Sequence, residues 1–224
     1  TLPTWAVDFN NMNLTDSYYE KGWSLLYDSS TYLQSTADNK SYEAKPFGNN
    51  FPYELKKYIG KDYGKVNTTY FGNELTFEFA KSALQGEQLG KRGTTDFLAV
   101  SFSSPDYIGH SFGPNSVEIE DTYIKLDKEI ADFLSYLDQK VGKGQYLFFM
   151  TADHGVAHVP SFLEANQIPA KGMKPDPKSL DESYRKLKEL EASWFKPDPT
   201  FRSLGDDLSG HEAAMITFGV KAAA

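Results

Sequence analysis

The sequence predicts an α/β protein whose framework is part of a doubly wound, mainly parallel sheet, with an irregular, aromatic-rich insertion at the N-terminal side. Two short apolar runs, residues 96–103 and 145–151, have the length and the Val/Phe content of strands that are buried on both faces. A long amphipathic pattern lies between them. Strand, helix and strand in this order form a crossover unit, which predicts a parallel sheet with helices packed on it.

The composition sets limits on the class of protein. The chain has 224 residues, of which 40% are hydrophobic and 24% charged, and this excludes wholesale disorder and leaves room for one substantial domain. No apolar run approaches the roughly 20 residues of a membrane span, so none is expected. A net charge of −8 argues against a nucleic-acid polymer as a partner. Because cysteine is absent, a metal would have to be bound by Asp, Glu, His or backbone oxygen.

Residues 1–68 are expected to form an irregular cap or insertion. Aromatic side chains are scattered there among Asn, Asp, Ser and Lys without a helical or strand period: Tyr18, Tyr19, Trp23, Tyr27, Tyr32, Tyr42, Phe47, Phe51, Tyr53, Tyr58 and Tyr63. One interpretation is a subdomain held together by aromatic packing. The other is a platform on which sugars or bases stack.

Residues 69–170 are expected to form the α/β core. Apolar side chains at Leu75, Phe79 and Leu84 predict a helix over residues 74–85. Asn115 as N-cap and Glu118 as the second half of a capping box predict the start of the long helix between the two strands. Its apolar side recurs every three or four residues, at Ile119, Tyr123, Leu126, Ile130, Phe133 and Leu137.

Residues 171–224 are expected to follow the core as a loop, a charged helix and a possible closing strand. Two prolines and a glycine over residues 171–178 indicate the loop, and residues 180–194 have the pattern of a charged amphipathic helix. The apolar run at 214–218 is the candidate strand.

The residues that carry chemistry follow the two predicted strands. Asp106 and His110 come just after the first, and Asp153 and His154 just after the second. Ligands of an open parallel sheet bind at the carboxyl ends of its strands, so both pairs are expected at one edge. Asp106 and His110 share a face if the backbone there is helical, and Gly155 allows the tight bend that Asp153 and His154 need. Each pair alone is more often a surface hydrogen bond or a turn, whereas the two together favour a metal site.

The same residues resemble the alkaline phosphatase superfamily. Asp106-Tyr107-Ile108-Gly109-His110 and the later Thr151-Ala152-Asp153-His154-Gly155 look like its metal-binding motifs, in the expected order and spacing. The resemblance is strongest to the bacterial periplasmic alkaline phosphatases and the related type I phosphodiesterases and nucleotide pyrophosphatases. It is dense over residues 69–169 and looser before them, and it implies the doubly wound sheet.

The resemblance also implies two zinc ions and a phosphate-ester small molecule as substrate. In it, Asp106 and His110 would ligate one zinc and Asp153 and His154 the other. His211, shortly before the possible closing strand, has the context of the last zinc ligand, although a surface histidine is the alternative and Glu212 replaces the usual Gly. His158 is not expected to be a ligand, because Pro160 argues against a helical pairing with His154. A periplasmic or secreted location is implied as well.

One part of the family pattern has no counterpart here. The Thr or Ser nucleophile, which forms a covalent phosphoryl-enzyme, and one more Asp ligand come earlier in the family, and nothing before Asp106 matches that segment. We therefore expect a fragment of a larger hydrolase, inactive alone, with a phosphomonoesterase favoured. A phosphodiesterase, a sulfatase or phosphomutase on the same scaffold, and a non-catalytic metal-binding module are the alternatives.

Overall fold

The computed structural model describes residues 1–168 and 215–220. The chain divides into two compact units, Thr1–Val159 with Ala213–Ala224, and Pro160–Glu212. The described part of the second unit contains the short helix α6 (Pro160–Ala165). No helix in the described ranges is both long enough and apolar enough to cross a lipid bilayer. The predicted loop and charged helix over residues 171–194 lie outside the described residues.

A three-stranded sheet lies in the first unit. Its strands β1 (Asp96–Ser101), β2 (Tyr146–Met150) and β3 (Met215–Val220) have the spatial order β1-β3-β2. Both β1 and β2 pair antiparallel with β3. They therefore run in the same direction, as the crossover between them requires, but they are not hydrogen-bonded to each other because β3 lies between them. The wider doubly wound, mainly parallel sheet stays a prediction.

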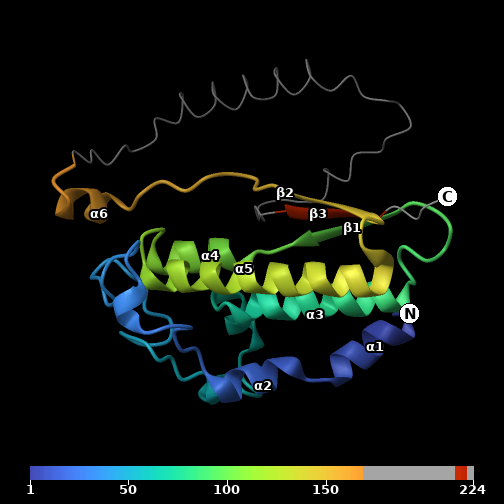
Figure 1. Ribbon diagram of the computed structural model, residues 1–224. Helices are drawn as coiled ribbons and strands as arrows, with labels where there is room; N and C mark the ends of the chain where they lie inside the picture. The colour runs from blue at the N-terminus through green and yellow to red at the C-terminus, as the bar shows by residue number, and fades with distance from the viewer. Residues whose placement is uncertain (169–214, 221–224) are drawn as a thin grey trace, which may run out of the picture. The chain divides into compact units, whose positions relative to one another are not determined.

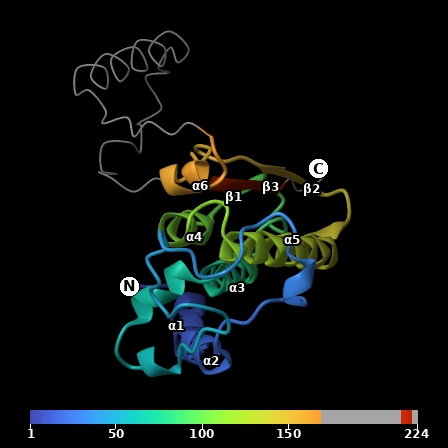
Figure 2. The same cartoon turned by 90° about the vertical axis from the view of Figure 1, so that its left-hand side faces the viewer.

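Two long helices cover one face of this sheet. Helix α3 (Phe71–Gly86) and helix α5 (Val117–Leu137) lie side by side beneath the strands in both views (Figures 1 and 2). The core between helices and sheet consists of buried apolar side chains, namely Phe77, Ala80, Leu84, Leu89, Val100, Phe102, Leu126, Phe133 and Leu137. A short π-helical turn, Asp138–Gly142, extends α5 toward β2.

The N-terminal region contains two helices that the sequence pattern did not predict. They are α1 (Thr4–Asn11) and α2 (Leu14–Lys21), followed by 3₁₀ turns at Ser29–Thr31, Lys56–Tyr58 and Tyr63–Thr68. Each helix has eight residues and little apolar periodicity, so packing rather than intrinsic propensity stabilises it. Five of the eleven scattered aromatic side chains belong to a second core, and Phe51 and Tyr58 pack against it. This core is made of Tyr18, Tyr19, Trp23, Phe47, Tyr53, Leu55, Val66, Phe71, Ile108, Phe112 and Ile119. The N-terminal region thus shares a core with the helix that follows β1 and with the first turn of α5.

Helix α3 has two apolar faces where one was expected. Phe77 faces the sheet, whereas Phe79 is 44% exposed and Leu75 is half-buried. The ring of Phe79 lies 5.3 Å from that of Trp5 and 5.0 Å from that of Phe9, both from α1. A single buried face would have placed Phe79 in the core between helix and sheet. Contact with α1 explains why this apolar residue lies outside it.

The start of α5 differs by one residue from the prediction. Ser116, not Asn115, is the N-cap, and its Oγ accepts a hydrogen bond from the backbone N–H of Ile119 at 3.3 Å. Glu118 closes no capping box. Its side chain is fully buried and accepts a 2.6 Å hydrogen bond from the hydroxyl of Tyr53.

Candidate metal centre

Helix α4 (Ser104–Phe112) follows β1 directly and carries the first pair of predicted ligands. Pro105 favours its first turn, and Gly113 ends it with a φ of 90°. Ile108 and Phe112 are buried in the aromatic core. Because these residues anchor one side of a nine-residue helix, Asp106 is held at the other side, with His110 one turn later.

Close contact with α3 fixes the first turn of α4. A Cβ atom added at Gly72 would lie 2.0 Å from the Oγ of Ser104 and 3.1 Å from the carbonyl oxygen of Val66. The absence of a side chain at Gly72 therefore allows α3 to approach the point where the chain leaves β1. This position sits in the Phe71-Gly72-Asn73 stretch of the sequence.

The second pair of predicted ligands lies in the segment after β2, and its local geometry is specific. The backbone N–H of His154 donates to Oδ1 of Asp153 at 3.0 Å. Nδ1 of His154 lies 2.9 Å from the carbonyl oxygen of Gly155. A carbonyl only accepts hydrogen bonds, so Nδ1 carries a proton in this contact, and in the neutral tautomer Nε2 would carry the lone pair. This second-sphere contact is the one that metal-binding histidines commonly make.

The structure brings the four side chains from the two strand ends together. Nε2 of His110 lies 3.5 Å from Oδ1 of Asp106, and Nε2 of His154 lies 3.9 Å from the same oxygen. Nε2 of His154 lies 3.7 Å from Oδ2 of Asp153. Asp106 therefore faces a histidine from its own helix and a histidine from the other strand end.

These donors form a row rather than one closed cluster. In the described residues, no three of them bring ligand atoms within 4.8 Å of one another. The side chain of His110 is 79% exposed, whereas those of Asp106, Asp153 and His154 are between 23% and 35% exposed. Two imidazoles and two carboxylates are a donor set that zinc accepts, and neighbouring ligands of a tetrahedral zinc lie about 3.3 Å apart. As they stand, no more than two of the four residues present ligand atoms to one common position.

Among the described residues, His158 does not join this row. Nδ1 of His158 lies 2.8 Å from Oδ1 of Asn115, a residue just before the start of α5. His211 and Glu212 lie outside the described residues, and their roles remain predictions.

Comparison with known proteins gives one family and several relatives. The model of the family described as type I phosphodiesterase / nucleotide pyrophosphatase matches residues 3–195. Alkaline phosphatase PhoV of Synechococcus elongatus is 53% identical over 171 residues, which are 75% of this chain and 31% of that protein. A Myroides odoratus protein named calcium-transporting ATPase is 52% identical over 170 residues, 72% of this chain and 31% of that protein.

A third relative has a solved structure. Alkaline phosphatase PafA of Elizabethkingia meningoseptica is 43% identical over 192 residues, 84% of this chain and 35% of PafA. A crystal structure of wild-type PafA matches with a TM-score of 0.68 and 37% identity, covering 85% of this chain and 37% of that chain. The likeness confirms the predicted α/β class. The chain spans about a third of the length of these relatives.

Proposed function

Because the chain belongs to the type I phosphodiesterase / nucleotide pyrophosphatase family, we propose that it forms part of a zinc-dependent phosphate-ester hydrolase. The observation that supports this most directly is the row of Asp106, His110, Asp153 and His154, in which two strand ends contribute a carboxylate and an imidazole each. A phosphate monoester is the favoured substrate, since two of the relatives above are named alkaline phosphatases.

The four side chains have distinct roles in the proposal. Asp106 and His110 hold one zinc ion, and Asp153 and His154 hold the other, with His211 as a further donor. A bound zinc pair would polarise the phosphoryl group and neutralise charge that develops on its oxygens. The contact between Nδ1 of His154 and the carbonyl of Gly155 keeps the Nε2 lone pair directed at the ion.

The chemical step needs groups beyond these four. We place the Thr or Ser nucleophile of a covalent phosphoryl-enzyme in another part of the complete protein, since the chain spans about a third of its relatives. A periplasmic or secreted location is part of the same proposal and rests on the family resemblance. A phosphodiesterase is the second candidate, favoured by the description of the family. A metal-binding module without turnover is the non-enzymatic alternative.

The test is Asp106→Asn in the complete protein that contains this chain. Asparagine keeps the size of the side chain but removes the charge between the two histidines. We expect the zinc content, measured by mass spectrometry after gel filtration, to fall by at least one ion per chain. Turnover of p-nitrophenyl phosphate should fall by at least about a hundredfold, because the proposed clamp on the phosphoryl group is lost.

A matched histidine pair controls for general damage. His154→Gln should have the same effect as Asp106→Asn, whereas His158→Gln should keep both zinc ions, since His158 contacts Asn115 instead of the row. Retention of both ions by Asp106→Asn would refute the ligand assignment. Zinc binding without turnover of any phosphate ester by the unaltered protein would favour the non-catalytic module.

A further inference from the structure

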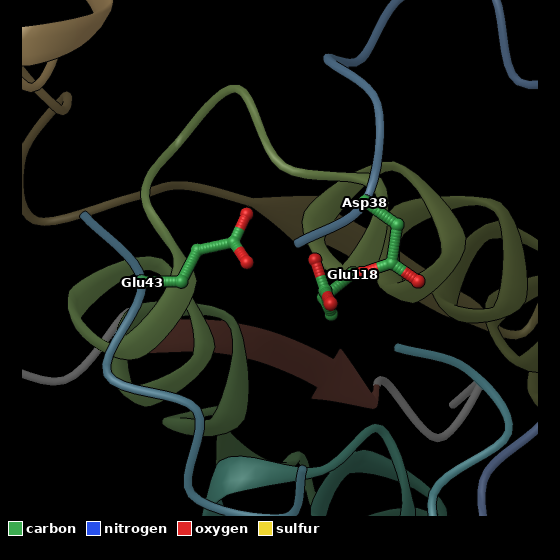
Figure 3. A group of neighbouring side chains, drawn as sticks. All are labelled: Asp38, Glu43 and Glu118. Atoms are coloured by element: carbon green, nitrogen blue, oxygen red, sulfur yellow. The ribbon is translucent and has the colours of Figure 1, made fainter. Parts of the chain in front are cut away.

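Three carboxylates meet at a second place in the first unit, and they share no residue with the row. Asp38 and Glu43 come from the irregular loop segment between α2 and α3, and Glu118 comes from the first turn of α5. One ligand atom from each lies within 4.8 Å of the other two. Figure 3 shows Glu43 reaching in from one side and Glu118 and Asp38 from the other, so that the three carboxylates border a common space.

Two of these carboxylates are buried and incompletely paired. Glu118 has no exposed surface, and Glu43 is 7% exposed. Oε2 of Glu118 and Oε1 of Glu43 are inaccessible to solvent and have no hydrogen-bond partner among the described residues. A buried carboxylate oxygen without a partner costs free energy, so a bound group that satisfies both oxygens is strongly favoured.

The remaining oxygens of the three carboxylates are fixed by neutral donors. The Tyr53 hydroxyl donates to Oε1 of Glu118 at 2.6 Å. The backbone N–H of Lys40 donates to Oε2 of Glu43, and that of Phe51 to Oδ2 of Asp38, both at 2.9 Å. None of the ion pairs between described residues includes any of the three. The carboxylates are thus held in place by neutral donors, and the nearby Lys40 and Lys45 act on Glu43 only at distances longer than an ion pair.

We propose that Asp38, Glu43 and Glu118 bind a calcium ion. Three oxygen ligands with formal charge −3 suit a hard divalent cation better than a transition metal that prefers nitrogen or sulfur. Three atoms that all lie within 4.8 Å of one another can be reached from one point at about 2.8 Å or less, which is close to calcium–oxygen distances of about 2.3–2.6 Å. Magnesium, at about 2.1 Å, requires a tighter set.

The position of the site gives the ion a structural role. The loop with Asp38 and Glu43 is attached by two backbone hydrogen bonds of 2.7 Å to the last turn of α4 and the turn after it, Ala44 N–H to the carbonyl of Ser111 and Thr36 N–H to that of Asn115. An ion bound by this loop and by Glu118 would join the same two parts of the fold. Calcium is therefore expected to stabilise the packing of the loop against the end of the helix that carries Asp106 and His110.

A shared proton is the competing explanation. Burial raises the pKa of Glu118 to about 7, with Asp38 and Glu43 adding to the effect, and burial also raises the pKa of Glu43. A protonated Glu118 could donate to a neighbouring carboxylate and satisfy one of the two unpaired oxygens. The two explanations predict different effects of added calcium on binding and on the melting temperature.

The experiment uses the complete protein that contains this chain, purified metal-free and then loaded with zinc. Calcium chloride alone is titrated at pH 8, and binding is followed by calorimetry and by the melting temperature. We expect saturable binding and a rise of several degrees in the melting temperature, with a weaker response to magnesium. Glu118→Gln should weaken calcium binding by at least about tenfold, because affinity follows the number of charged ligands.

The sign of the Glu118→Gln effect on stability separates the explanations further. Without calcium, the variant should melt higher than the unaltered protein at pH 8, because the substitution removes a repelled buried charge. With saturating calcium, the order should reverse. Asp38→Asn, on the less buried loop, tests the same site if Glu118→Gln fails to fold.

Two controls isolate the site. Glu120→Gln removes the same charge two residues further along α5, outside the group, and should keep calcium affinity unchanged. His110→Ala should lose zinc but keep the calcium response, so the outcome is independent of the proposed hydrolase activity. Absence of saturable calcium binding by the unaltered protein, equal affinity of Glu118→Gln, or a stronger response to magnesium would overturn the proposal.

Discussion

Asp121 is a buried carboxylate whose desolvation is offset by four hydrogen-bond and ion-pair donors. It has no exposed surface, and its Oδ1 accepts hydrogen bonds from the backbone N–H of Leu26 at 2.8 Å and the hydroxyl of Tyr32 at 2.6 Å. Oδ2 accepts from Nε1 of Trp23 at 2.8 Å and pairs with Nζ of Lys125 at 2.6 Å. Three of these four donors come from the chain that follows α2, so the carboxylate joins that segment to α5.

Lys125 depends on this arrangement. Its Nζ donates to the carbonyl of Ser24 at 2.7 Å and lies 3.8 Å from the centre of the Tyr70 ring. Burial lowers its pKa, and the adjacent Asp121 opposes that effect. The charge of Lys125 is thus tolerated in the interior because a carboxylate, a carbonyl and an aromatic face surround it.

Asp121→Ala should destabilise the protein by about 3–5 kcal/mol, because it leaves Lys125 as an unpaired buried charge and removes the acceptor of three further donors. The free energy of unfolding in urea measures this loss. Glu20→Gln is the control, since the Glu20–Lys56 pair is 51% and 73% exposed and is worth less than about 1 kcal/mol. Similar losses for both variants would contradict the role given to Asp121.

At the scale of elements, α3 and α5 enclose titratable groups between them. Glu129 of α5 lines a surface cavity together with Glu74 and Lys81 of α3 and with Lys125 and Asp132 of its own helix. Burial, followed by repulsion from Glu74, raises the pKa of Glu129 to about 8. Its Oε2 has no hydrogen-bond partner in the described part of the chain. The contact between the two helices is therefore sensitive to pH.

The sign of this sensitivity follows from proton binding. Between the ordinary glutamate pKa near 4.5 and about 8, the folded state holds a proton on Glu129 that the unfolded state has lost. The contribution of Glu129 to the free energy of unfolding is greatest at low pH. It decreases as pH rises through this window, by at most about 1.4 kcal/mol per pH unit. Glu129→Gln should flatten the decrease and unfold at higher urea concentration than the unaltered protein at pH 8.5.

Urea unfolding between pH 5 and pH 8.5 tests this expectation. Asp127→Asn is the matched control, because Asp127 is exposed on the same helix and should leave the slope of stability against pH unchanged. Parallel curves for Glu129→Gln and the unaltered protein would show that Glu129 carries its charge in the folded state at all these pH values.

At the scale of the first unit, the sheet is covered on one face and apolar on the other. Side chains that point to the helices, such as Val100 and Phe148, belong to the core. Those that alternate with them, Phe97 and Leu147, are each 66% exposed, and Phe149 is 44% exposed. The two outer strands, β1 and β2, thus present apolar side chains on the same surface of the sheet, which is unusual for a sheet that faces water.

The 224-residue polypeptide should therefore bind the apolar dye ANS in its folded state. The double variant Phe97→Ser with Leu147→Ser should bind clearly less dye than the unaltered polypeptide, because it removes the two most exposed apolar side chains of this face. Leu33→Ser is the control, since Leu33 is 78% exposed but lies outside the sheet. Equal dye fluorescence for the double variant would show that the sheet face is not the dye-binding surface.

Local patterns in the sequence determined the two strands, the two long helices and the pairing of Asp with His after each strand. Those features depend on residues close together in the chain, such as the nearly continuous apolar run around Val100 and the four-residue spacing of Asp106 and His110. The helices α1 and α2 and the second apolar face of α3 could not be predicted in this way. Helix α1 packs where Trp5 and Phe9 meet Phe79, and α2 packs where Tyr18 stacks on Phe71, contacts between residues about 50 to 70 positions apart.

Only the tertiary structure decided which acidic residues act together. Glu118 has the spacing of a capping residue, and nothing near Asp38 or Glu43 in the sequence marks them as ligands, yet packing of the N-terminal loop against α5 brings the three together and buries Glu43 and Glu118. The same holds for the order of the strands, since the insertion of β3 between β1 and β2 depends on a segment at the far end of the chain. Periodicity reports which side of an element is apolar, whereas the partner of that side is set by the packing free energy of the whole fold.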